Sequence, residues 1–177
     1  MTDVRFYHLT RTRLEDALPV MLQRTLMRGE RAVVRLTTPE RLKAVDEWLW
    51  TFEDAAFIPH GRAGGDQGAN HGSDQPVWLT MGTDNPAEAG CLFIGEGADL
   101  SDFADFRVCA VLFDGRVEAA VSQARTQWAA VKKAADAAAA LVETRDDRAA
   151  DVADTVEPDH VLSYWRQNER GGWEKAQ

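Results

Sequence analysis

Cysteine is scarce in this sequence, and the residue types that bind metals are dispersed along it. The 177-residue chain has two cysteines, Cys91 and Cys109, each alone in an apolar segment, and four histidines without H-x-x-x-H spacing. This pattern predicts neither a disulfide framework nor a metal site. We expect both cysteines to be buried thiols in a protein that occupies a reducing compartment.

Long apolar runs are also absent, and positive charge is in short supply. No run approaches the roughly 18 residues of a membrane-spanning helix, and the opening MTDVRFYHLT does not resemble a secretory leader. We therefore expect a soluble cytoplasmic protein with no membrane partner. Lys and Arg number 20 against 29 Asp and Glu, a net charge of −9 at pH 7. Because nonspecific nucleic-acid binding needs a basic surface, an anionic partner would have to meet a local basic patch.

The nucleotide-binding and nucleophile motifs of common enzymes are missing. The glycine-rich segment 61–72 has no G-x-x-x-x-G-K-[ST] and no lysine, the turn HLTRTRLED lacks G-x-G-x-x-G, and no G-x-S-x-G occurs. We expect no cofactor and no catalytic residue. His60, which follows Pro59, is the one polar residue in a suggestive position. A role in fixing the base of the loop by hydrogen bonds is favoured over acid–base chemistry.

Apolar spacing predicts alternating strands and helices. Strands are predicted at 4–9, 32–36, 76–81, 89–94 and 107–113. Helices are predicted to begin near Arg13 and Pro39, with Thr10 or Thr12 capping the first and Gly29 ending it. The order strand, helix, strand, helix favours a right-handed parallel unit, and therefore an α/β fold.

Composition divides the chain into three segments. Residues 1–133 read as the α/β core domain, with a mobile surface loop at 61–75. Residues 134–161 are rich in alanine and aspartate, and we expect a helical extension that frays into an acidic linker. In 162–177, Gly171-Gly172 separates two aromatic stretches, which predicts a C-terminal aromatic hairpin packing on the core.

The predicted helix 116–133 carries an unusual combination of side chains. Its apolar stripe is Val117, Ala120, Val121, Ala124, Trp128, Val131 and Ala135. Arg125, Trp128 and Lys132 follow i, i+3, i+7 spacing and therefore line one flank, which we call the basic–aromatic flank. Two cations beside an indole suit a ligand that is both anionic and apolar. From the residues alone, the plainer alternative is favoured: Trp128 anchors the helix and the cations are solvated.

Several blocks of the sequence resemble a known family. The opening FYHL, the segment LWTFEDAAFIPHG, the A-R-x-x-W of the last long helix and the ending SYWRQNERGGWEK are similar to the chi subunit of bacterial DNA polymerase III holoenzyme. The resemblance spans roughly 1–133 and 162–175. It implies a three-layer α/β/α Rossmann-like sandwich with a mostly parallel sheet of four or five strands and no nucleotide site. It also implies a non-catalytic adaptor of the replisome, an accessory subunit of a DNA-directed DNA polymerase.

The resemblance further implies two protein partners. The acidic C-terminal tail of the single-stranded DNA-binding protein would contact Arg125, Trp128 and Lys132, with Ala129 standing where the family often has lysine. The psi subunit, or a clamp-loader component, would contact a different face, for which the candidates are Trp50, Phe57, Ile58 and Pro59. A role of that block in packing a loop is an equal alternative. DNA would be met only indirectly.

Two other functions remain as rivals. The first is a degenerate nucleotide-binding domain, which the missing glycine motifs disfavour. The second is a direct single-stranded DNA binder that uses the six tryptophans as stacking platforms. The net charge of −9 argues against it.

Overall fold

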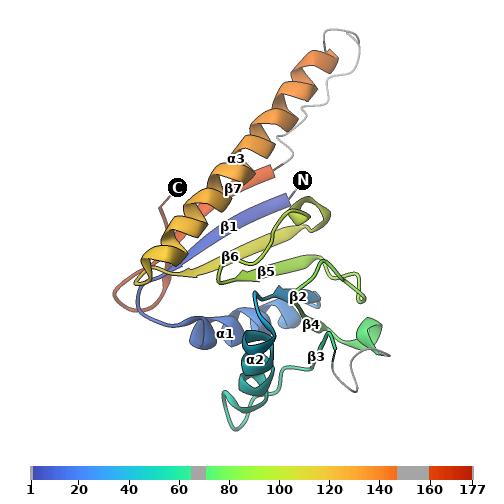
Figure 1. Cartoon of the computed structure of the whole chain (residues 1–177), viewed down its shortest axis with the longest axis vertical. Helices are drawn as coiled ribbons and strands as arrows, with labels where there is room; N and C mark the ends of the chain where they lie inside the picture. The colour runs from blue at the N-terminus through green and yellow to red at the C-terminus, as the bar shows by residue number, and fades with distance from the viewer. Residues whose placement is uncertain (1, 65–70, 147–159, 177) are drawn as a thin grey trace.

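The chain folds around one sheet, shown in a computed structural model that describes residues 2–64, 71–146 and 160–176 (Figure 1). The strands are β1 Thr2–Leu9, β2 Ala32–Arg35, β3 His60–Arg62, β4 Val77–Thr80, β5 Cys91–Gly95, β6 Val108–Asp114, β7 His160–Gln167 and β8 Trp173–Lys175. The α-helices are α1 Leu14–Met27, α2 Pro39–Thr51 and α3 Glu118–Asp146. Short 3-10 turns occur at Gly72–Asp74 and Phe103–Asp105.

The sheet has the order β3-β4-β2-β5-β6-β1-β7-β8, and every neighbouring pair is parallel except β7 with β8. The mostly parallel α/β sandwich is therefore confirmed, whereas the expected four or five strands are wrong, because the described residues form eight. One extra strand is β3, which pairs with β4 where a loop was predicted. The other two are β7 and β8. Strand β7 pairs with β1, in register from Thr2 with His160 to His8 with Arg166, and β8 pairs with β7.

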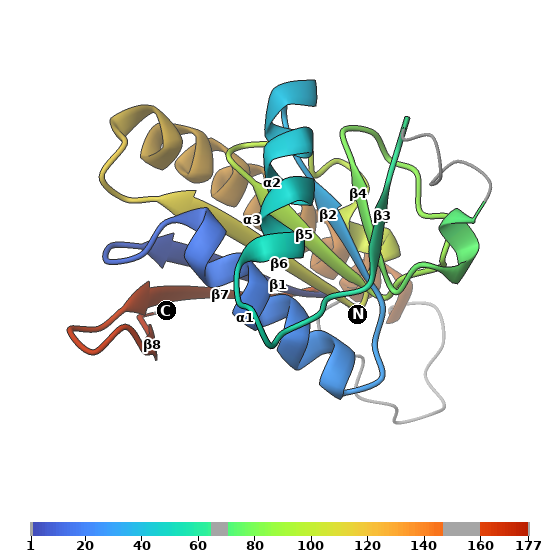
Figure 2. The ribbon, with the colours of Figure 1, turned by 90° about the horizontal axis from the view of Figure 1, so that it is seen from below.

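Helices cover both faces of the sheet (Figure 2). Side chains alternate along β1, so that Tyr7 and Leu9 join the core beneath α1 and α2, while Val4 and Phe6 join the core beneath α3. The buried side chains of α2 are Leu42, Val45 and Leu49, as its spacing predicts. Two cores on opposite faces of one sheet make the three-layer sandwich.

The first helix begins differently from the sequence prediction. Arg13 occupies the N-cap position of α1, and its backbone N–H donates to Asp16 Oδ2 at 3.1 Å. The caps expected from Thr10 or Thr12 are therefore wrong. Gly29 follows the helix with φ +73°, a left-handed conformation that glycine adopts without steric cost.

The last helix continues beyond 133 as a helical extension, as predicted: α3 runs to Asp146, and its C-terminal part projects beyond the sheet (Figure 1). Ala124, Gln127 and Val131 are buried against the sheet, and Gln127 Nε2 donates to Ala98 O at 2.8 Å. Val117, predicted as part of the buried stripe, is 49% exposed. The acidic linker expected beyond the helix includes 147–159, which lie outside the described residues.

The remaining predictions concern the glycine-rich segment and the membrane. Residues 65–70 of the predicted mobile loop are outside the described part of the chain, whereas Gly72–Asp74 forms a 3-10 turn. Among the described residues, no helix combines the length and apolar character that crossing a membrane requires.

Candidate functional site

A small cavity lies between α3 and the part of the sheet formed by β6, β1 and β7. Its volume is about 280 Å³. The sheet contributes Phe6, His8, Phe113 and Tyr164, and α3 contributes Val121, Ala124, Arg125 and Trp128. We call it the aromatic cavity. Even-numbered residues of β1 and alternate residues of β7 face α3. The residues of α3 recur at three- and four-residue steps and therefore lie on one face of the helix. The strands and the helix thus direct these side chains into the same space.

Trp128 is fixed in this cavity by edge-to-face contacts. Its ring centroid lies 5.1 Å from that of Phe6 at an interplanar angle of 72°, and 6.1 Å from that of Tyr164 at 81°. Such T-shaped pairs are favourable because the positive edge of one ring meets the negative face of another. The indole is half-buried, so it both anchors the helix and contributes a cavity wall.

His8 and Tyr164 form the polar part of the cavity. The Tyr164 hydroxyl and His8 Nδ1 share a hydrogen bond of 2.6 Å, and the imidazole stacks on Phe113 with centroids 5.0 Å apart. Burial lowers the pKa of His8, the charge of Arg166 lowers it further, and Asp114 opposes the shift. Burial also raises the pKa of Tyr164, against the charges of Arg166 and Arg125. Both groups are therefore neutral at pH 7.

Gly115 leaves the space that the imidazole of His8 needs. A Cβ at position 115 would lie 1.7 Å from His8 Nε2, far closer than any non-bonded contact. The turn between β6 and α3 thus requires glycine for a steric reason, while His8 holds its place beside Phe113.

The basic–aromatic flank is only partly gathered at the cavity. Arg125 and Trp128 both line it, and Arg125 is exposed. Lys132 is exposed one helical turn beyond Trp128 and is not among the lining residues. Within the described ranges, neither Arg125 nor Lys132 enters an ion pair. Sequence reasoning did not single out His8, Phe113 or Tyr164, although Tyr164 stands in the SYWRQ block.

The second candidate face lies at α2 and the segment that follows it. Trp50 is 55% and Phe57 66% exposed, and their ring centroids are 5.7 Å apart. Pro59 is half-buried, whereas Ile58 is fully buried and supports the face from beneath. Two large exposed aromatic rings in contact are unusual for a solvated surface.

His60 has the structural surroundings that the sequence favoured. Its buried ring donates from Nδ1 to Ile58 O at 2.7 Å, and Nε2 lies 3.2 Å from Asp46 Oδ1. Asp46 accepts from Arg62 Nε at 3.0 Å, so helix α2 and strand β3 are tied together. His60 therefore holds the chain where it enters β3.

The turn after β1, where Rossmann-like folds bind phosphate, is already paired within the chain. The backbone N–H groups of Thr10, Arg11 and Thr12 donate to Gln167 Oε1 at 3.1, 3.0 and 3.2 Å. Gln167 Nε2 in turn donates to Thr12 Oγ1 at 2.7 Å. In dinucleotide-binding domains such N–H groups meet the pyrophosphate. Here a side chain of β7 satisfies them, which argues against a nucleotide at this turn.

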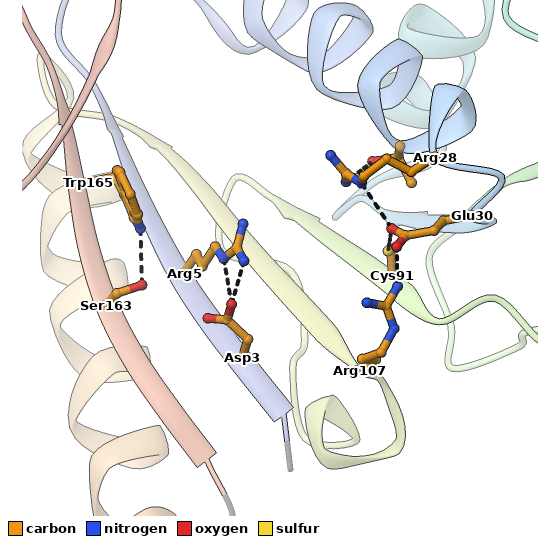
Figure 3. Close-up of polar contacts among 9 residues, drawn as sticks. Asp3, Arg5, Arg28, Glu30, Cys91, Arg107, Ser163 and Trp165 are labelled. Atoms are coloured by element: carbon orange, nitrogen blue, oxygen red, sulfur yellow. Dashed lines mark hydrogen bonds and ion pairs between the residues drawn. The ribbon is translucent and has the colours of Figure 1, made fainter.

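Polar residues also gather at the opposite, amino-terminal edge of the sheet, where Figure 3 shows Arg28, Cys91 and Arg107 converging on Glu30. Burial, followed by the hydrogen bond to Glu30, raises the pKa of Cys91 to about 12. The thiol is therefore protonated and unreactive at neutral pH. Across the residues that the structure describes, no group of three or more His, Cys, Asp or Glu is arranged to hold a metal ion.

Comparison with known families adds an independent finding. The family model described as DNA polymerase III chi subunit, HolC, matches residues 1–138. No curated protein matches the chain. The matched span contains Arg125, Trp128 and Lys132, and it ends before β7, which contributes Tyr164 to the aromatic cavity.

Proposed function

The chain belongs to the family of DNA polymerase III chi subunits, and we propose that it binds the acidic C-terminal tail of the single-stranded DNA-binding protein and links that protein to the clamp loader and polymerase. Membership gives the chain an accessory role in DNA replication. The proposal adds how that role is performed. The chain would be a non-catalytic adaptor, and it would meet DNA only through its partner.

The observation that carries the proposal is the aromatic cavity with Arg125 beside it. Its volume of about 280 Å³ lies below the roughly 300–1,000 Å³ of sites that bury drug-sized ligands. One large apolar side chain suits this space better than a nucleotide does. An apolar C-terminal residue would place its side chain against Trp128 and Tyr164. Its terminal carboxylate would then lie within reach of the Arg125 guanidinium, which binds carboxylates with two parallel hydrogen bonds.

The two parts of such a contact differ in strength. An exposed ion pair contributes about 0–1 kcal/mol, whereas an aromatic anchor in a desolvated pocket contributes about 2 kcal/mol or more. Trp128 should therefore dominate. Ala129, where the family resemblance implies a lysine, supplies no cation and increases that dependence. Each contact would be weak, and a partner that carries several tails would tether the adaptor by avidity.

The exposed aromatic pair of Trp50 and Phe57 supports a second proposed contact. These rings lie on α2 and the segment after it, on the face of the sheet opposite to α3. A psi subunit or another clamp-loader component would cover them, with Pro59 at the edge and Ile58 in the core below. The two partners would then bind on different faces, as a linking role requires.

Recruitment to coated DNA tests the adaptor function. Single-stranded DNA is immobilised and covered with the host's single-stranded DNA-binding protein, either intact or lacking its last residues. We expect the chain to bind the intact coat and to lose binding when the tail is removed. Trp128→Ala should lose most of the binding, while Arg24→Ala, an exposed arginine on α1, should keep it. Equal binding to both coats would contradict the proposal.

Two further measurements test the rival functions. Binding to uncoated DNA that falls steeply with salt would support a direct DNA-binding role. A rise in melting temperature with ATP would support a nucleotide site. We expect neither, because the chain is acidic and Gln167 pairs the turn after β1.

A further inference from the structure

A second, larger cavity lies at the carboxyl-terminal end of β1 and β7. It lies between the β1–α1 turn and the β7–β8 hairpin and has a volume of about 720 Å³. Its charged lining consists of Arg11, Arg166, Arg170, Glu169 and Glu174. We call it the arginine cavity. The chain has a net charge of −9, whereas the three arginines outnumber the two glutamates around this cavity, so the local charge is positive.

Arg166 lines the arginine cavity and lies close to two residues of the aromatic cavity, His8 and Tyr164. It follows Tyr164 by two residues on β7, so both side chains face the side of the sheet that α3 covers. It also stands opposite His8 of β1 in the parallel register. The positive charge of Arg166 acts to lower the pKa values of both His8 and Tyr164, as expected for a guanidinium beside the aromatic cavity.

The cations of this region are available to a ligand. No ion pair among the residues described involves Arg11, Arg166 or Arg170. The acidic groups that oppose them are Glu169 in the hairpin turn and Glu174, which faces Arg166 across the β7–β8 pair.

On the side of α3, Arg125 adds another exposed cation. Asp114 is already held by Arg116 at 2.7 Å. The region that runs from Arg125 to the arginine cavity therefore presents an excess of positive charge.

We propose that the arginine cavity and Arg166 bind the acidic residues that precede the apolar end of the tail. The inference rests on the proposed function, because the aromatic cavity must hold the end of the same peptide. An extended peptide advances about 3.3 Å per residue, so three or four residues reach about 10–13 Å beyond an anchored end. Guanidinium groups suit carboxylates spaced along such a chain.

A peptide fits this surface better than nucleic acid does. A phosphate backbone carries a negative charge on every nucleotide, and it would meet Glu169 and Glu174 within the same cavity. In an extended acidic peptide successive side chains point to opposite sides, so alternate carboxylates can meet the arginines while the others stay in solvent, away from these two carboxylates. The aromatic cavity would thus hold the end of the tail, and the arginine cavity would select tails with acidic residues before that end.

Calorimetric titration with two peptides tests the inference. The first peptide has three aspartates followed by the apolar terminal residues of the partner's tail, and in the second the aspartates are replaced by asparagine. We expect Arg166→Gln to weaken binding of the acidic peptide by roughly twofold to fivefold. The double variant Arg11→Gln with Arg170→Gln should weaken it by a similar factor. Neither should change the affinity for the asparagine peptide, and Arg24→Gln should change neither affinity.

Salt dependence provides a second readout. Screening weakens exposed charge pairs, so the affinity of the acidic peptide should fall with salt more steeply for the wild type than for Arg166→Gln. Arg166→Lys keeps the charge without the paired hydrogen bonds and should give an intermediate affinity. Circular dichroism and the melting temperature verify that each variant is folded.

The outcomes separate this inference from the function on which it rests. If the acidic peptide binds the wild type and needs Trp128 but not Arg11, Arg166 or Arg170, the inference is overturned and the proposed function stands. Equal losses for both peptides would also overturn it, because the arginines would then act on the fold. No binding of either peptide would overturn both. An effect of Arg166→Gln on an oligonucleotide but not on the acidic peptide would assign the cavity to nucleic acid.

Discussion

Gln167→Ala should destabilise the fold, because one side chain satisfies four polar groups. Gln167 is 6% exposed, its Oε1 accepts from three backbone N–H groups of the turn 10–12, and its Nε2 donates to Thr12 Oγ1. Each hydrogen bond contributes roughly 0.5–1.5 kcal/mol net. Water can replace some of the lost hydrogen bonds, since Arg11 is exposed and Thr10 and Thr12 are half-buried. We expect the free energy of unfolding to fall by about 2–4 kcal/mol.

Urea denaturation followed by circular dichroism measures this change. The midpoint should fall with an unchanged slope, because the surface exposed on unfolding stays the same. Gln167→Glu is the matched control, since its carboxylate at pH 7 can still accept from the three N–H groups. It should cost about 1 kcal/mol or less. A Gln167→Ala variant within about 0.5 kcal/mol of wild type would refute the reasoning, because the turn would then be held by other contacts.

Three further predictions concern pH, sterics and reactivity. The pKa of His8 is lowered in the folded chain, so the unfolded chain binds the proton more tightly. The free energy of unfolding should therefore fall as the pH drops from 7 through the ordinary histidine pKa of about 6.5. His8→Gln should make this fall shallower in denaturation at pH 7, 6 and 5; an unchanged pH profile would contradict it. Gly115→Ala should destabilise strongly, because its Cβ would meet His8 Nε2, and His8→Ala should restore part of the loss in thermal melts. Cys91, with a pKa of about 12, should react with a thiol reagent at pH 7 only after unfolding; rapid labelling of the native protein at Cys91 would be inconsistent with its burial.

Local pattern was sufficient for most elements of the fold. Strands β2, β4, β5 and β6 are short apolar segments between turn signals, and they form close to the predicted positions. The errors arose where pairing partners are distant in sequence. Strand β3 is a three-residue edge with little apolar content, and it exists because β4 offers free backbone groups. The pairing of β7 with β1 joins residues about 158 apart, and no local spacing encodes it.

The candidate site shows the same limit. Helical spacing found Arg125 and Trp128 because they share one element. It could not find His8, Phe113 and Tyr164, because three separate strands supply them and only the sheet order β6-β1-β7 makes them neighbours. Lys132 follows Arg125 by seven residues, roughly 10 Å along the helix axis, and this distance leaves it outside the cavity. Gln167 was missed because its partners lie in the turn after β1.

The central claim is that the aromatic cavity binds the end of an acidic tail. Its most direct test is the fluorescence anisotropy of a labelled peptide with the last residues of the host's single-stranded DNA-binding protein, titrated with wild type and variants. We predict saturable binding that weakens about 30-fold in Trp128→Ala and about fivefold in Arg125→Ala, and that disappears when the peptide lacks its terminal residue. Arg24→Ala should bind like wild type. No binding at low salt, or full binding by a folded Trp128→Ala variant, would contradict the claim.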